Sequence, residues 1–66
     1  MKPKRLSQWE AVELNTIANG GGQRPGPAYI YPERMQKLIK RGLVEMRDGT
    51  PTVTKEGSRA FRAWEG

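Results

Sequence analysis

The residues whose types and spacing could do chemistry are mostly basic, and they gather in the middle of the chain. One short stretch contains Arg34, Gln36, Lys37, Lys40 and Arg41. On a helix, residues three or four positions apart share a face, so several of these side chains could meet neighbouring phosphates together. Lysine binds phosphate as a point charge and arginine as a planar fork. These residues therefore favour polyanion binding.

The remaining side chains do not favour catalysis. The sequence has no histidine and no cysteine, which excludes disulfides, thiolate chemistry, imidazole acid–base catalysis and ordinary zinc sites. Ser7 and Ser58 both stand near predicted helix starts, which explains them without a nucleophilic role. The seven carboxylates are scattered, and we expect no two of them to be buried together as paired acid–base catalysis requires. We therefore expect no enzyme, no cofactor and no metal.

Length and charge narrow the class of protein. A chain of 66 residues allows one small domain with a modest core. Twelve lysines and arginines against seven acidic residues give a net charge of +5, which favours polyanionic or acidic partners. We find no apolar run long enough to span a membrane and no signal-peptide pattern. The absence of cysteine fits a reducing compartment, so we expect a cytoplasmic protein.

Residues 1–6 are predicted to form a basic arm, and residues 7–66 a single domain. Lys2, Lys4 and Arg5 make the arm either a solvated tail that keeps a small protein soluble or a segment that lies along phosphates. The sequence leaves both interpretations open.

The first helix is predicted to begin at Ser7. Ser7 and Glu10 are spaced as a capping box, in which each side chain bonds the backbone amide of the other residue. Apolar residues then recur at helical spacing as far as Ala18, where Asn19 and the following glycines end the helix.

Residues 19–27 are rich in glycine and proline, so we expect a flexible loop. Their spacing matches no phosphate-binding glycine motif. Residues 28–31 then favour a short edge strand.

Residues 32–41 are predicted to form the second helix. Pro32 suits the first helical position, and Gly42 suits the left-handed residue that follows the last turn. The apolar stripe of this helix consists of Met35, Leu38 and Ile39. Gln36 and most of the basic residues lie on the opposite face, with Arg34 at its border.

A β-hairpin and a third helix complete the chain. Residues 43–47 and 50–53 are β-prone and flank Asp48-Gly49, a strong signal for a two-residue turn. Thr54 is placed as the N-cap of a helix over residues 55–64. One face of this helix carries Gly57, Ala60, Phe61 and Trp64, and the other carries Lys55, Arg59 and Arg62.

This order of elements predicts an α+β fold, in which three helices pack against a two-stranded hairpin and residues 28–31 are a candidate third strand. We expect one core made of Leu6, Val12, Leu14, Ile17, Ile30, Met35, Leu38, Ile39, Leu43, Val44, Val53, Phe61 and Trp64.

Two spaced motifs between residues 35 and 61 resemble the winged helix-turn-helix domains of MarR-type regulators. In those proteins a recognition helix ends in L-x-x-[KR]-G-L-[VI]-E, and the last strand of the wing leads into [LV]-T-x-E-G-[RS]-x. The matching residues are Leu38, Lys40, Arg41, Gly42, Leu43, Val44 and Glu45, followed by Val53, Thr54, Glu56, Gly57 and Ser58. Residues 19–30 stand where such domains usually carry another helix.

The resemblance implies that residues 32–41 enter the DNA major groove and that the hairpin is a wing. The implied nucleic-acid contacts are Arg34, Gln36, Lys37, Lys40, Arg41 and Arg47, with Lys2, Lys4, Arg5 and Arg24 as further arm or loop contacts. A single short helix reads few bases, so we expect a homodimer or weak, non-specific binding to duplex DNA, in a role such as transcriptional regulation. The simpler interpretation is a solvated basic face supported by a Glu33–Lys37 pair.

The alternative function is a protein-interaction module, such as a phage-encoded inhibitor or adaptor that docks on an acidic or nucleic-acid-binding host protein. Trp9, Tyr29 and Tyr31 are aromatic residues of the kind enriched at interfaces, and ordinary partial burial explains them equally simply.

Overall fold

The computed structural model describes residues 3–21 and 29–66. In chain order the elements are α1 (Gln8–Ala18), α2 (Pro32–Lys40), β1 (Val44–Arg47), β2 (Thr50–Val53) and α3 (Lys55–Glu65). The described part of the chain is thus an α+β domain with three helices and one two-stranded antiparallel hairpin, a layout like that of a winged helix. None of these helices is long and apolar enough to cross a membrane.

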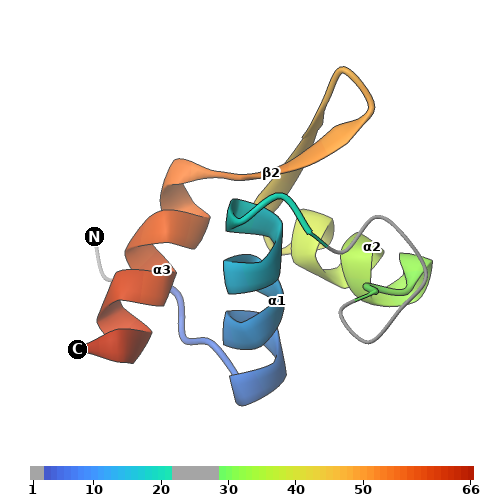
Figure 1. Cartoon of the computed structure of the whole chain (residues 1–66). Helices are drawn as coiled ribbons and strands as arrows, with labels where there is room; N and C mark the ends of the chain where they lie inside the picture. Colours follow the sequence, from blue (N-terminus) through green and yellow to red (C-terminus); the bar gives the residue numbers. More distant parts are fainter. Residues whose placement is uncertain (1–2, 22–28) are drawn as a thin grey trace.

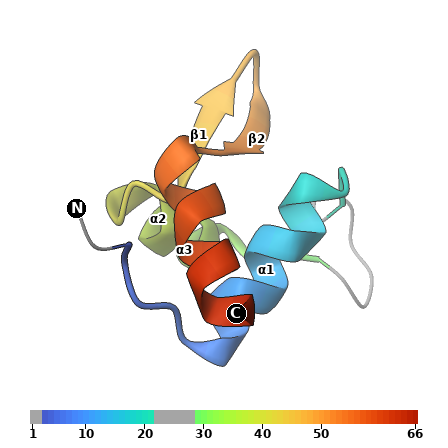
Figure 2. The same cartoon turned by 90° about the vertical axis from the view of Figure 1, so that its left-hand side faces the viewer.

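The central helix is α1, which lies between α3 on one side and α2 on the other (Figure 1). The hairpin projects away from the three helices in both views (Figures 1 and 2). Such an arrangement lets one core serve all the elements while the hairpin turn and the outer sides of α2 and α3 stay in solvent.

Local signals set both ends of α1 as predicted. At its start, the Glu10 carboxylate accepts hydrogen bonds from the Ser7 amide at 2.9 Å and from the Ser7 hydroxyl at 3.1 Å. At its end, Gly20 adopts a φ of 80°, and its amide donates to the Ile17 carbonyl at 2.9 Å. A left-handed residue of this kind satisfies carbonyls that the helix itself leaves unpaired.

Helix α2 begins at Pro32 as predicted and ends at Lys40, with Arg41 as its C-cap. Gly42 has a φ of 75°, and the amide of Leu43 reaches back to the Leu38 carbonyl at 3.0 Å. This is the Schellman arrangement, and it turns Leu43 into the core directly after the helix.

The hairpin turn also has the predicted geometry. Arg47 faces Thr50 across the pair of strands, so the loop contains only Asp48 and Gly49. Both loop residues have positive φ values, 50° and 78°, which is the type I′ geometry that matches the twist of the strands. Pro51 faces Met46 in the same ladder and is tolerated because a two-stranded sheet has only edge strands.

The two motifs that carry the winged-helix resemblance contact each other at the junction between β2 and α3. The Thr54 hydroxyl donates to the Gly42 carbonyl at 2.6 Å and accepts from the Gly57 amide at 3.0 Å, which makes Thr54 the predicted N-cap. The Thr54 amide also donates to the Leu43 carbonyl at 3.0 Å. The end of α2 is therefore bonded directly to the start of α3.

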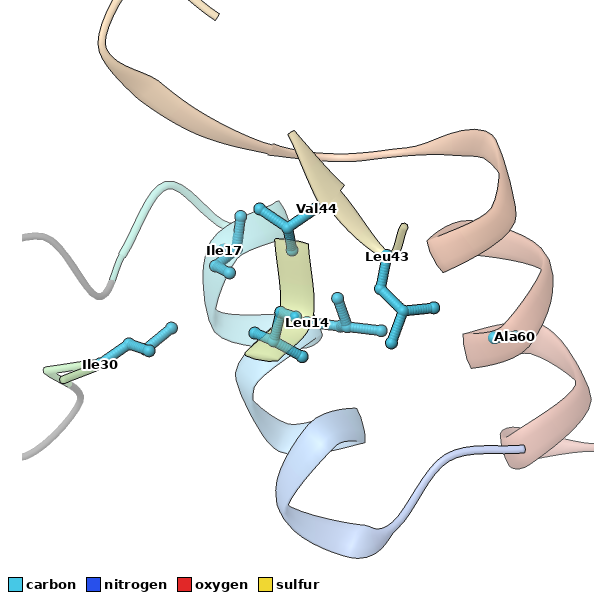
Figure 3. Packing of buried hydrophobic residues seen from close by; sticks show 7 residues of the cluster. Leu14, Ile17, Ile30, Leu43, Val44 and Ala60 are labelled. Atoms are coloured by element: carbon cyan, nitrogen blue, oxygen red, sulfur yellow. The ribbon is translucent and has the colours of Figure 1, made fainter. Parts of the chain in front are cut away.

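A single apolar cluster joins all three helices and the hairpin (Figure 3). Its buried members are Leu14, Ile17, Ile30, Leu38, Leu43, Val44 and Ala60. Around them pack the partly buried Leu6, Trp9, Met35, Ile39, Val53 and Phe61.

Two residues of the predicted core lie outside it. Val12 is 55% exposed because it lies on the side of α1 opposite Leu14 and Ile17, where no other described element covers it. Trp64 is 47% exposed because it sits in the last turn of α3, beyond the core, with its ring 5.9 Å from that of Phe61.

Residues 29–31 form no strand, although Ile30 is buried in the core. The hairpin is the only sheet in the described residues, and its outer edges have no third partner. Ala28 and the greater part of the predicted loop, residues 22–27, lie outside the described residues.

Candidate nucleic-acid interface

Arg34 ties α2 to α1 instead of pointing to solvent alone. Its Nη1 atom lies 3.0 Å from Oε1 of Glu13, and its guanidinium lies 5.5 Å from the centre of the Trp9 ring. Glu13 is buried on the inner side of α1, whereas the Arg34 side chain is more than half exposed. The ion pair and the cation–π contact fix the N-terminal half of α2 against α1.

Arg41 ties down the other end of α2. It was expected to face outward as a nucleic-acid contact, but its Nη1 pairs with Oε2 of Glu10, and its Nη2 donates to the Arg5 carbonyl at 2.8 Å. The ammonium group of Lys4 in turn donates to the Arg41 carbonyl and lies 3.3 Å from Glu56. These contacts join the N-terminal arm, α1, α2 and α3 through one cluster of charges.

The environment of Glu10 favours its ionised form. Burial by itself raises the pKa of this carboxyl, but hydrogen bonds from the Arg41 guanidinium and from the amide and hydroxyl of Ser7 outweigh burial. The net result is a pKa below the ordinary value of 4.5. Glu10 is therefore a structural anion at neutral pH.

The expectation that no two carboxylates are buried together is wrong. Glu10 and Glu13 lie one turn apart on α1 and are 5% and 7% exposed. Each is paired with an arginine of the α2 segment, and the pKa of Glu10 is lowered rather than raised. A proton donor in paired acid–base catalysis needs the opposite shift, so the pair is better explained as the anchor of α2.

The remaining predicted contacts of α2 are exposed. Gln36, Lys37 and Lys40 face solvent, and neither lysine has an ion pair within residues 3–21 and 29–66. Arg47 extends from the hairpin, with its side chain 71% exposed and its Nε 2.7 Å from Glu45. An exposed pair of this kind is weak and can exchange for another anion.

The predicted arm and loop contacts have different positions. Lys4 is held by Glu56 and Arg41, whereas Arg5 is exposed and offers its carbonyl to Arg41. Lys2 and Arg24 lie outside the described residues. The described end of the arm is therefore packed onto the domain rather than extended into solvent.

Two surface features were not among the predicted sites. The α3 basic stripe, defined as Lys55, Arg59 and Arg62, is exposed, and its helical spacing was visible in the sequence. The second feature is an open groove of about 370 Å³ between α2 and the hairpin, bordered by Tyr29, Ile30, Pro32, Met35, Gln36, Ile39, Met46, Gly49 and Pro51. No local sequence signal indicated this groove, because residues from three segments form it.

Comparison with known proteins gives no match to a protein-family model, a curated protein or a solved structure.

Proposed function

We propose that this chain binds duplex DNA through the outer side of α2, with the hairpin as a wing. The observation that carries the proposal is the division of basic residues on one short helix. Arg34 and Arg41 are bound to buried carboxylates, while Lys37 and Lys40 are exposed and have no ion pair in the described part of the chain. Because α2 is already anchored, its two exposed lysines can meet phosphates without any further ordering of the helix backbone.

In this proposal each residue has a distinct role. Lys37 and Lys40 contact phosphates, and Gln36 reaches a base edge or the backbone, because all three are exposed. Arg47 on the hairpin contacts the flanking backbone after releasing Glu45. Arg34 and Arg41 position α2, which revises their expected role as direct contacts.

A short helix with few contacts supports weak, non-specific binding by one chain, and a homodimer would add a second half-site. A cytoplasmic protein that regulates transcription is the role that we propose on this basis. The net charge of +5 supports fast, salt-sensitive association with DNA.

The test is the salt dependence of binding to a short labelled duplex. The native chain is expected to bind with an affinity that falls steeply with salt, and Lys37→Ala/Lys40→Ala is expected to weaken binding and lower the slope of log K against log salt by about 2. Lys37→Arg/Lys40→Arg is the matched control and should keep both affinity and slope. The absence of duplex binding at about 50 mM salt would exclude the proposal.

The groove between α2 and the hairpin favours a second candidate function, docking on a protein. Met46 borders this groove and is 51% exposed. Tyr31 lies beside the groove and is 62% exposed, and its ring meets that of the bordering Tyr29 edge-on at 5.1 Å. Exposed aromatic and methionine side chains are typical of interfaces. The partner that suits both the groove and the net charge is an acidic host protein that inserts an apolar segment into the groove. This chain would then act as a phage-encoded inhibitor or adaptor.

Substitution of Tyr31 distinguishes the two functions. If the chain docks on a protein, Tyr31→Ser should abolish recovery of one defined partner and leave duplex binding unchanged. Recovery of nothing except nucleic acid by the native chain would exclude docking.

A further inference from the structure

The α3 basic stripe lies on the side of its helix that faces away from the core. Lys55, Arg59 and Arg62 are spaced by four and three residues, so they share one side of α3. Gly57 and Ala60, on the opposite side, are buried. Packing therefore leaves all three cations in solvent.

No member of the stripe forms an ion pair within the described residues. The ion pairs there use Glu10, Glu13, Glu45 and Glu56, and none of them involves a cation of the stripe. Glu56, the acidic residue of the first turn of α3, is taken by Lys4. The three positive charges thus act together on an external anion.

The length of the stripe suits a nucleic-acid backbone. From Lys55 to Arg62 the helix rises by about 10 Å. Duplex DNA carries roughly one phosphate charge for every 1.7 Å of its axis, so several phosphates fall within this span. Two arginines and a lysine can contact such a row without reading bases.

The stripe and the outer side of α2 face away from each other. Leu38 of α2 and Ala60 of α3 belong to the same core cluster, so the two helices turn their inner sides toward one interior. In Figure 1 α3 and α2 lie on opposite sides of α1. The two basic surfaces point away from this shared interior in different directions, so a straight duplex on the outer side of α2 does not run along the stripe.

We propose that the α3 basic stripe is a second phosphate-binding surface, with which one chain bridges two DNA duplexes. This inference rests on the proposed binding of a first duplex by α2. The stripe binds more weakly than the α2 surface because no amide side chain and no hairpin arginine supplement its three members, whereas Gln36 and Arg47 supplement Lys37 and Lys40. Its function is to hold a second segment of DNA beside the first.

Energy transfer between two short duplexes, one carrying a donor dye and one an acceptor, tests the bridging. The native chain should bring the dyes together, and Lys55→Gln/Arg59→Gln/Arg62→Gln should abolish the transfer while changing the affinity for a single duplex by no more than about twofold. Lys55→Arg/Arg59→Lys/Arg62→Lys is the charge-matched control and should retain the transfer. Thermal unfolding of each variant verifies that it folds.

The outcomes separate the two proposals. Binding of single duplexes without energy transfer would overturn the bridging inference and leave α2 binding intact. Energy transfer that survives the triple glutamine variant would also overturn it, because bridging would then come from a homodimer that uses α2 twice. The absence of any duplex binding would overturn both proposals together.

Discussion

At the residue scale, Gly57 shows how closely the start of α3 approaches the strand segment. A Cβ atom added to Gly57 would lie 2.3 Å from the Leu43 carbonyl oxygen and 2.9 Å from Cγ1 of Val53. The nearest atom belongs to the backbone, so the contact cannot be relieved by turning a flexible side chain. The glycine of the matched motif is thus required by packing rather than by an unusual φ.

Gly57→Ala is therefore expected to destabilise the fold by about 2–3 kcal/mol, despite the better helix propensity of alanine. Urea unfolding measures the loss. Ser58→Ala, at the next and exposed position of α3, is the control and should change stability by less than about 0.5 kcal/mol. Equal stability of the two variants would show that α3 does not pack as described.

Glu10 makes stability depend on pH in a defined direction. Its pKa in the folded chain is below the ordinary value of 4.5, so the folded state holds the carboxylate more strongly than the unfolded state does. The resulting stability is fully present at neutral pH. It is lost as the pH falls below 4.5 and through the folded pKa, because the unfolded chain takes up the proton first.

Glu10→Gln should cost about 1–2 kcal/mol at pH 7, a modest figure because Arg41 is partly exposed and solvent screens the pair. The cost should shrink at pH 3, where the native carboxyl is also losing its charge. Unfolding free energies at the two pH values measure the change. Glu65→Gln, at an exposed carboxylate, is the control substitution and should change stability by less than about 0.5 kcal/mol. An equal cost of Glu10→Gln at the two pH values would contradict the assignment.

At the scale of elements, α2 is held by contacts at both of its ends rather than by a broad apolar face. Leu38 is its one buried residue, while Met35 and Ile39 are partly buried. The Arg34–Glu13 and Arg41–Glu10 pairs supply the remaining attachment to α1. The orientation of α2 is consequently set by charge pairing at both ends as well as by the packing of its apolar stripe.

The Arg34–Glu13 pair should behave non-additively. Oε2 of Glu13 is buried and has no hydrogen-bond partner in the described part of the chain, so loss of Arg34 leaves a buried charge poorly compensated. Arg34→Met is expected to cost about 1–2 kcal/mol, whereas Arg34→Met/Glu13→Met should fall within about 0.5 kcal/mol of the native chain. A double-mutant cycle from urea unfolding provides the measurement, and additive effects would contradict the coupling.

At the scale of the whole molecule, eight of the twelve basic residues form two groups. Lys4, Arg34 and Arg41 are bonded to carboxylates or carbonyls across element boundaries and hold the fold together. The other group, which is exposed on α2 and α3, consists of Lys37, Lys40, Lys55, Arg59 and Arg62. Some of the positive charges therefore stabilise the fold through intramolecular bonds, and others are exposed on the outer surfaces of α2 and α3.

The two groups should respond differently to neutralisation. Lys55→Gln/Arg59→Gln/Arg62→Gln reduces the net charge from +5 to +2, yet stability should change by no more than about 0.5 kcal/mol, because no ion pair is lost and like-charge repulsion falls. Arg41→Gln removes one charge and should cost more than this triple change. Thermal unfolding at one fixed ionic strength compares them, and a less stable triple variant would show that the stripe serves the fold.

Local sequence signals predicted the elements well, for a physical reason. The capping box at Ser7, the left-handed Gly20 and Gly42, and the Asp48-Gly49 turn each act within a few residues, so their geometry depends little on the rest of the chain. The predicted fold class and the order of the three helices and the hairpin are confirmed, whereas residues 29–31 do not form the candidate strand. The predicted binding role of α2 stays a prediction.

Only the tertiary structure determines which basic residues form intramolecular ion pairs and which do not. Arg34 and Lys37 carry the same charge on the same helix, but the partner of Arg34 lies 21 residues away along the chain, and that of Arg41 lies 31 residues away. Such pairs depend on how α2 docks on α1, and no helical spacing encodes that docking. The sequence by itself determined where each helix and turn begins and ends, because those choices are local; the packing of distant elements determined which charges hold the fold and which remain available to a partner.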